Sequence, residues 1–172
     1  MLPTATDVYD ARRRLGSRVP RTPLLPSSWL SSIADGDVFL KIESLNLTHS
    51  FKIRGALNAA LRLRDAGSTP TIVSASAGNH GRAIALAAEQ LGLPCVVFTP
   101  STAPEAKQNA IRRHGAVLHN DSEDYDTAER RAKAFAEAEG GVYVSPYNNA
   151  DVIAGAGTCL LYTSDAADDT PC

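Results

Sequence analysis

The sequence has little cysteine and histidine, and it has no long hydrophobic run. Its three cysteines, Cys95, Cys159 and Cys172, share no metal-ligand or redox spacing, which argues against a disulfide framework. The four histidines are scattered, and none lies four residues from another, as a helix-borne metal pair requires. No apolar run approaches the roughly 18–20 residues of a membrane span, and the N-terminus lacks the apolar core of a signal peptide. We therefore expect a cytoplasmic protein without a metal or a membrane partner.

An excess of charge of either sign is also missing. Lysine and arginine number 17 against 19 aspartates and glutamates, so the formal net charge is −2. This balance gives no electrostatic signal for a nucleic-acid partner. The one basic run, Arg12–Arg14, suits the C-terminal end of a helix, where the dipole favours cations. The hydrophobic content of 44% and charged content of 21% are typical of a soluble globular protein.

From Asp37 onward, strand-like and helix-like segments alternate. The strand candidates are apolar runs at 37–44, 71–76, 94–100, 116–120 and 142–145. The helix candidates lie between them, at 50–67, 78–92, 102–115 and 121–141. Ser50 and Gly67 are the expected N-cap and C-terminal stop of the first of these helices. Continuous apolar strands separated by helices predict an α/β fold with a doubly wound parallel sheet, which binds ligands beyond the carboxyl ends of its strands.

The segment SASAGNHG, residues 74–81, joins a predicted strand to a predicted helix. Gly78 permits a tight turn, and Ser76 and Asn79 add side-chain donors. A helix N-terminus presents unpaired N–H groups and the positive end of the dipole, so this loop suits a small anion such as a carboxylate or a phosphate. The alternative is that the glycine and the asparagine serve only the turn, and that the serine caps the helix. The loop is neither a Walker A sequence nor a GxGxxG fingerprint, which argues against a nucleotide site.

Lys52 lies near the start of the first of these predicted helices, in the sequence HSFKIRGA. The helix dipole disfavours a cation there, which indicates that the amine has another role. Burial beside the positive helix end and Arg54 would lower the pKa of the amine and supply the free base that Schiff-base chemistry needs. The alternative is an ordinary surface lysine. Arg54 points elsewhere around the helix, and we expect it to form an ion pair rather than to act in catalysis.

Three motifs follow one another in the chain: SFKIRGA at 50–56, SASAGNHG at 74–81 and VIAGAGT at 152–158. Together they resemble the fold-type II pyridoxal-phosphate enzymes, in particular the branch of threonine and serine dehydratases (threonine ammonia-lyases) and serine racemase. The resemblance covers about residues 5–158. One departure is Ala156, where the family usually has glutamine.

The resemblance implies roles for individual residues. Lys52 would bind the cofactor pyridoxal 5′-phosphate as a Schiff base, Phe51 would pack against the pyridine ring, and Asn79 would hydrogen-bond the 3′-hydroxyl. The substrate carboxylate would be received by a loop of Ser76, Ala77, Gly78, Asn79 and His80. The implied reaction is the dehydration and deamination of L-threonine or L-serine to a 2-oxo acid and ammonia.

One residue of the loop bears on the choice of reaction. A racemase of this branch has a serine immediately before the glycine of the loop, whereas this chain has Ala77, which has no proton to give. Tyr147 also resembles the aromatic residue of the dehydratases. We therefore expect a dehydratase. The alternatives are a racemase or β-replacement enzyme on the same scaffold, and a non-enzymatic domain that binds a small anion. The residues leave open the choice among threonine, serine and hydroxyaspartate as the substrate.

The resemblance also predicts how the chain is organised. Residues 1–43 would belong to an incomplete large domain, and residues 44–147 would form the small α/β domain. Residues 148–158 would return toward the large domain. Residues 159–172, CLLYTSDAADDTPC, resemble translated adapter sequence, and no helix is expected beyond Tyr162.

This organisation makes the chain an N-terminal fragment of a longer enzyme. The fragment is expected to be inactive by itself, because the cofactor phosphate loop and the partner of the pyridine nitrogen lie in the second half of the family's chains. Leu24, Leu25 and Trp29 are expected to lack cover. The full-length protein is expected to be a homo-oligomer that acts on a small amino acid.

Overall fold

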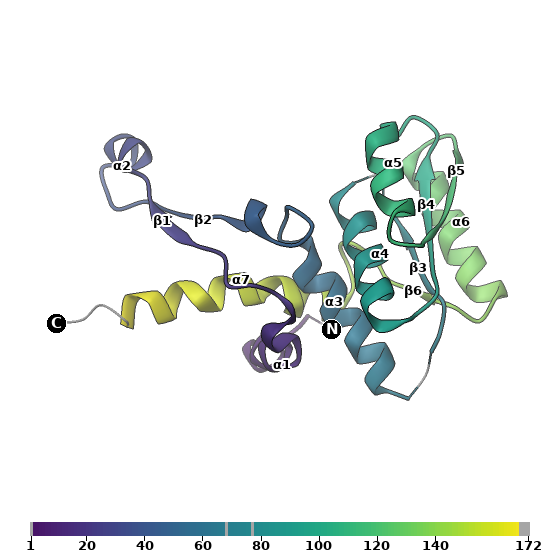
Figure 1. Cartoon of the computed structure of the whole chain (residues 1–172), viewed down its shortest axis with the longest axis horizontal. Coiled ribbons are helices and arrows are strands. Elements are labelled where there is room, and N and C mark those ends of the chain that lie inside the picture. Colours follow the sequence, from purple (N-terminus) through teal and green to yellow (C-terminus); the bar gives the residue numbers. More distant parts are fainter. Residues whose placement is uncertain (1, 68, 77, 169–172) are drawn as a thin grey trace.

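A parallel sheet lies at the centre of the fold, as shown by a computed structural model that describes residues 2–67, 69–76 and 78–168, with side chains up to residue 161. The sheet has four strands in the order β5-β4-β3-β6 (Figure 1). The strands are β3 (Ile72–Ala75), β4 (Cys95–Pro100), β5 (Val117–Ser122) and β6 (Val142–Tyr143). All neighbouring strands in it are parallel, and β3 and β4 are buried along their whole length. The predicted parallel sheet is confirmed.

Helices cover both faces of this sheet. The elements on one face are α3 (Lys52–Asp65), α4 (Asn79–Leu91) and α5 (Glu105–Arg112), and α6 (Tyr125–Ala138) lies on the other. Alternate residues of β3 show the division, since Ile72 packs in the core with α3 and α4 while Val73 packs with α6. The chain winds from β3 to β5 over one face and returns to β6 over the other. The predicted doubly wound α/β arrangement is therefore confirmed.

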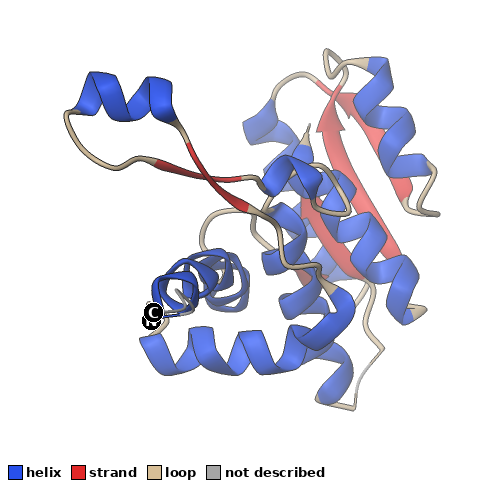
Figure 2. Cartoon of the chain, turned by 60° about the vertical axis from the view of Figure 1, so that its left-hand side comes forward, coloured by secondary structure: helices blue, strands red, loops and turns tan. Residues whose placement is uncertain are grey.

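The segment before α3 forms an arm that projects from this body. β1 (Leu24–Pro26) and β2 (Phe39–Lys41) make an antiparallel ribbon, and α2 (Ser28–Ala34) lies at its tip (Figures 1 and 2). The strand predicted at 37–44 exists only over its central residues, and it pairs with β1 rather than with the parallel sheet. The sequence analysis did not predict β1, because its three residues are too few to show a period.

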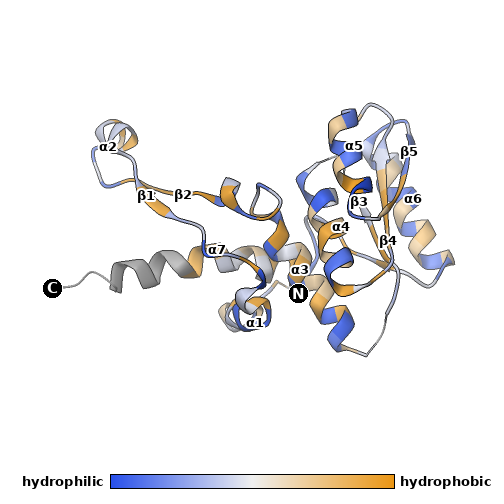
Figure 3. Ribbon diagram, viewed as in Figure 1, coloured by the Kyte–Doolittle hydropathy of each residue, from blue (hydrophilic) through white to orange (hydrophobic). Residues whose placement is uncertain are grey.

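The arm exposes several large apolar side chains. Leu25 is 51% exposed, Trp29 72% and Phe39 54%, and Figure 3 shows hydrophobic residues along β1 and β2. The expected lack of cover is confirmed for Leu25 and Trp29, whereas Leu24 is half-buried. Isolated apolar residues are common at protein surfaces, but several on one two-stranded ribbon mark a surface that suits further packing.

Two helix ends differ from the prediction. α3 begins at Lys52, and its N-cap is Phe51 in the right-handed helical conformation, without a side-chain cap bond. Ser50 is therefore not the cap, and its buried hydroxyl has no hydrogen-bond partner. The stop at Gly67 is confirmed, since this glycine has a φ of 76° directly after the helix. α7 (Ala150–Asp168) continues beyond Tyr162, so the expectation that no helix follows that residue is wrong.

α7 crosses α3 at very short range. A Cβ on Gly155 would lie 2.5 Å from the carbonyl oxygen of Arg54 and 2.8 Å from the Cα of Gly55. Only glycine fits there. α1 (Ala5–Leu15) packs beside α7, where a Cβ on Gly157 would lie 3.1 Å from a methyl carbon of Val8. The small residues of VIAGAGT therefore serve helix packing. In the part of the chain that is described, no helix combines the length and the apolar character needed to cross a bilayer.

Candidate active site

The topology creates a crevice where β3 and β6 end. The chain leaves β3 toward α4 on one face of the sheet, and it reaches β6 from α6 on the other face. Adjacent parallel strands whose connections lie on opposite faces leave an opening beyond their carboxyl ends, where α/β proteins bind ligands. The hydroxyl of Ser74 donates to the carbonyl oxygen of Val144 at 2.8 Å and ties the two strand ends together.

A pocket of about 340 Å³ occupies this position. Its lining residues are Lys52, Ser76, Gly78, Asn79, His80, Lys107, Tyr125, Pro146 and Tyr147. The predicted site residues therefore come together from two distant motifs. Phe51 does not line the pocket, but its ring centroid lies 5.3 Å from the Nζ of Lys52. Ala77 lies outside the described residues.

Lys52 enters the pocket from the first turn of α3. Its Nζ donates to the carbonyl oxygen of Pro146 at 3.2 Å, and it lies 5.5 Å from the ring centroid of Tyr147. Burial lowers the pKa of this amine below its ordinary value. A lowered pKa increases the share of free amine at neutral pH, and only the free amine is a nucleophile. Lys52 is thus a half-buried amine fixed at the wall of a cavity.

The loop after β3 forms the opposite wall. The hydroxyl of Ser76 accepts a hydrogen bond from the backbone N–H of Gly78 at 3.2 Å, and α4 begins at the next residue without a side-chain cap. A Cβ on Gly81 would lie 2.9 Å from the carbonyl oxygen of Ser76, so this glycine lets the helix start directly beneath the loop. The N–H groups of the first turn of a helix have no partner within the helix, which makes this end of α4 an anion site.

His80 is buried at the base of the pocket. Its side chain belongs to a residue that is 3% exposed, and neither ring nitrogen has a hydrogen-bond partner among the described residues. Burial, followed by the nearby charge of Lys52, lowers the pKa of His80 to about 4. The imidazole is therefore neutral at physiological pH and leaves the positive charge of the pocket to its lysines.

Two tyrosines form the outer part of the pocket. The rings of Tyr125 and Tyr147 meet edge to face, with centroids 6.3 Å apart. Burial raises the pKa of Tyr125 to about 12, and its hydroxyl donates to the carbonyl oxygen of Ala75 at 3.4 Å. Sequence reasoning missed Tyr125 and Lys107. Both lie within the first turn of a helix that follows a strand, so a wider search of the residues after each strand would have found them.

Another cavity, of about 250 Å³, lies between α1, α3 and α7. Its charged groups have protein partners: Arg14 donates to Asn58 at 2.7 Å, and Arg62 lies 3.3 Å from Asp151. Groups that are already paired with one another serve packing between helices. Among the described residues, no cluster of histidine, cysteine and carboxylate side chains suits a metal ion.

Comparison with known proteins agrees with this site. The family model described as "Pyridoxal-phosphate dependent enzyme" matches residues 17–171. The β-hydroxyaspartate dehydratase of Paracoccus denitrificans is 37% identical over 170 residues, which are 97% of this chain and 53% of that protein. The L-threonine ammonia-lyase of Thermotoga maritima is 41% identical over 158 residues, which are 92% of this chain and 39% of that protein.

Solved structures give the same result. A pyridoxal 5′-phosphate-dependent aspartate racemase superposes with a TM-score of 0.90 at 34% identity, covering 97% of this chain and 52% of that one. The serine racemase of Dictyostelium discoideum superposes with a TM-score of 0.86 at 32% identity, covering 95% of this chain and 53% of that one. A bacterial-type threonine deaminase superposes equally well, with a TM-score of 0.86 at 35% identity. The chain thus spans about half the length of most of the relatives it matches.

Proposed function

Since the chain belongs to the pyridoxal-phosphate-dependent enzyme family, we propose that the full-length protein dehydrates and deaminates a β-hydroxy amino acid, with Lys52 as the cofactor-binding residue. The substrate would be L-threonine or L-serine, and the products a 2-oxo acid and ammonia. The observation that carries the proposal is the pocket that holds Lys52 and the start of α4 on facing walls. One wall offers a nucleophilic amine, and the other offers an anion site for a carboxylate.

The residues of the pocket fit pyridoxal phosphate in part. An amine with a lowered pKa suits the aldehyde of the cofactor, and Phe51 and Asn79 supply an aromatic face and an amide beside it. The unpartnered ring nitrogens of His80 are polar atoms that a bound ligand can satisfy. A cofactor phosphate would require donors beyond these, and we propose that the second half of a full-length chain provides them. The 172 residues alone would then be inactive.

Each wall has a separate task in the proposed reaction. The N–H groups at the start of α4, with Ser76 and Asn79, bind the substrate carboxylate and orient the Cα–H bond. The free amine of Lys52 takes the Cα proton and holds it at Nζ, which its lowered pKa permits. Tyr125 and Tyr147 cover the pocket and exclude water. Bound pyridoxal phosphate would supply the electron sink that stabilises charge at Cα.

Dehydration is favoured over racemisation by one residue. Ala77 has no proton to deliver to the second face of Cα, which a racemase needs. A racemase remains the second candidate, because an aspartate racemase has a very similar structure. Hydroxyaspartate joins threonine and serine as a candidate substrate, since a β-hydroxyaspartate dehydratase is among the relatives. We also propose a cytoplasmic homo-oligomer for the full-length protein, with residues 1–43 in a large domain and 44–147 in a small one.

An assay of 2-oxo acid formation by the full-length protein tests the proposal. L-threonine, L-serine and 3-hydroxyaspartate are each supplied with pyridoxal phosphate, and at least one is expected to give product that Lys52→Ala does not give. Ala77→Ser is expected to raise racemisation relative to elimination. A protein that binds carboxylates but forms no product would instead support a non-enzymatic anion-binding domain.

A further inference from the structure

The start of α3 lacks an ordinary cap although it carries Lys52. Its N-cap, Phe51, makes no side-chain hydrogen bond to the helix, and the hydroxyl of Ser50 is unpartnered. An N-cap side chain usually fixes the entry of the chain into a helix. Another interaction must therefore hold the first turn of α3, and hence Lys52, in its orientation.

Arg54, two residues after Lys52, provides such an interaction. It is 1% exposed, and its guanidinium donates from Nε and a terminal nitrogen to the two carboxylate oxygens of Glu43, at 2.9 Å each. The terminal nitrogen also donates to the carbonyl oxygen of Pro20 at 3.3 Å. A planar guanidinium paired with a carboxylate through two bonds fixes direction as well as distance.

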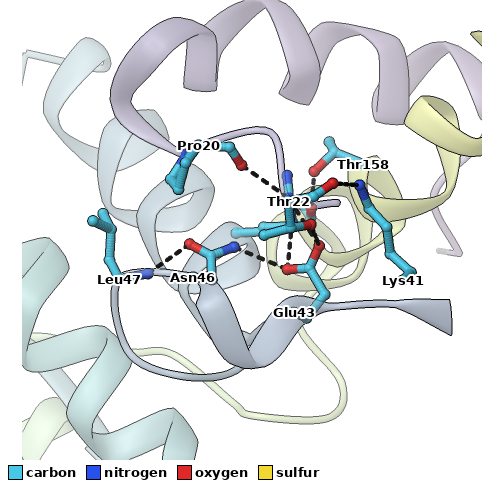
Figure 4. Close-up of polar contacts among 9 residues, drawn as sticks. Pro20, Thr22, Lys41, Glu43, Asn46, Leu47 and Thr158 are labelled. Carbon is cyan, nitrogen blue, oxygen red and sulfur yellow. Dashed lines mark hydrogen bonds and ion pairs between the residues drawn. The ribbon is translucent and has the colours of Figure 1, made fainter. Parts of the chain in front are cut away.

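Glu43 is filled from its other side by neutral groups. The hydroxyl of Thr22 donates to it at 2.7 Å and the amide of Asn46 at 2.9 Å, as Figure 4 shows. Burial by itself raises the pKa of Glu43, but the hydrogen bonds from Arg54, Thr22 and Asn46 lower it below its ordinary value overall. The carboxylate is therefore charged, and it joins the segment around Thr22, the turn after β2 and the first turn of α3.

Buried ion pairs are a weak source of stability, because removing two charges from water costs about as much as their attraction returns. Their better-attested role is to specify one arrangement among several. Residues two apart on an α-helix point in directions about 200° apart, so Lys52 and Arg54 lie on nearly opposite sides of α3. A rotation of the helix that breaks one contact must also move the other.

We propose that Arg54 and Glu43 are positioning residues for Lys52, because their buried fork fixes the rotation of α3 and so directs the amine into the pocket. This inference rests on the proposed role of Lys52 as the cofactor-binding residue. Arg54 contacts neither the pocket nor any reacting atom, so it acts only through the helix. The contact from Lys52 to Pro146 would then depend on a contact made on the far side of α3.

Competitive acetylation of the 172-residue chain without cofactor, with mass spectrometry across neutral and alkaline pH, tests the proposal. It gives a titration midpoint for Lys52 and, in the same digest, for the exposed Lys133. Arg54→Lys keeps the charge but removes the fork, and Glu43→Gln removes the pair. Both are expected to raise the Lys52 midpoint toward that of Lys133, with about a tenfold loss of free amine at neutral pH for each unit.

Arg131→Lys is the matched control. Arg131 makes the same two-bond fork to Asp121, at 2.9 Å for each bond, but it lies at the surface on another helix. Its substitution is expected to leave the Lys52 midpoint unchanged. The groups that line the pocket with Lys52, namely His80, Lys107, Tyr125 and Tyr147, are the same in every variant.

The outcomes separate a positioning role from a purely structural one. If Arg54→Lys and Glu43→Gln lower the thermal midpoint and leave the Lys52 titration unchanged, the proposal is overturned. Should Arg54→Lys fail to fold, Thr22→Val retains the ion pair, and a smaller shift in the same direction is then required. Because no cofactor is added, a failure of cofactor binding in the full-length protein would not produce either result.

Discussion

The Nζ of Lys52 donates to the carbonyl oxygen of Pro146 at 3.2 Å, although the two residues are 94 positions apart in the chain. The first belongs to the start of α3, and the second follows β6, the last strand of the parallel sheet. This contact places the amine at the carboxyl edge of the sheet, opposite the start of α4. The candidate active site is therefore a product of the doubly wound topology, in which β6 lies beside β3.

The crossing of α3 and α7 predicts that Gly155→Ala destabilises the chain. A Cβ there would lie 2.5 Å from the backbone oxygen of Arg54 and 2.7 Å from the Cβ of Asn58, so the helices must separate. Overpacking of this kind costs roughly 1–3 kcal/mol. Urea unfolding measures the loss. Gly36→Ala is the control, since the nearest atom to a Cβ at that glycine is 3.9 Å away, and equal effects at both positions would contradict the close crossing.

His49 predicts a reversal of the usual order of glycine and alanine. Its φ is 54°, a left-handed conformation that costs an alanine about 1–2 kcal/mol and glycine almost nothing. We expect His49→Gly to be more stable than His49→Ala by about 1 kcal/mol in thermal or urea unfolding. At Ala134, an exposed position inside α6, glycine is expected to be the less stable residue by a similar amount. The same order at both positions would show that the turn before Lys52 has another conformation.

The buried imidazole of His80 predicts a dependence of stability on pH. Burial and the charge of Lys52 lower the pKa of this group to about 4, so the unfolded chain binds the proton more readily. The stability that neutral His80 contributes is complete above its unfolded pKa and is lost as the pH falls through the folded value. Between about pH 7 and pH 4.5, wild type is expected to lose about 2–3 kcal/mol more unfolding free energy than His80→Gln. Equal losses in the two proteins would place the imidazole in water.

The sheet and its helices could be predicted from the sequence, because buried parallel strands are continuous apolar runs and their helices start and stop at recognisable residues. Gly67 and Gly78 are examples of such residues. The cap of α3 could not be predicted in this way. Ser50 is a favoured N-cap type, but the tertiary pair of Arg54 with Glu43 holds this helix instead, and no local propensity reports a partner eleven residues earlier.

The candidate site could be predicted less completely. Lys52 and the loop from Ser76 to His80 were recognised from two motifs, and the structure places their described members around one pocket. Lys107 and Tyr125 were missed because each stands alone in the first turn of an ordinary amphipathic helix. Only the register of neighbouring strands brings such residues to the same edge of a sheet.

The most direct test of the account is the visible absorbance of pyridoxal phosphate added to the full-length protein. Lys52 and Lys107 are the two lysines that line the pocket, so Lys107→Ala is the matched control for Lys52→Ala. The account predicts an absorbance band of bound cofactor in the wild type and in Lys107→Ala, and its loss in Lys52→Ala. A band that persists in Lys52→Ala, or one that is lost only in Lys107→Ala, would contradict it.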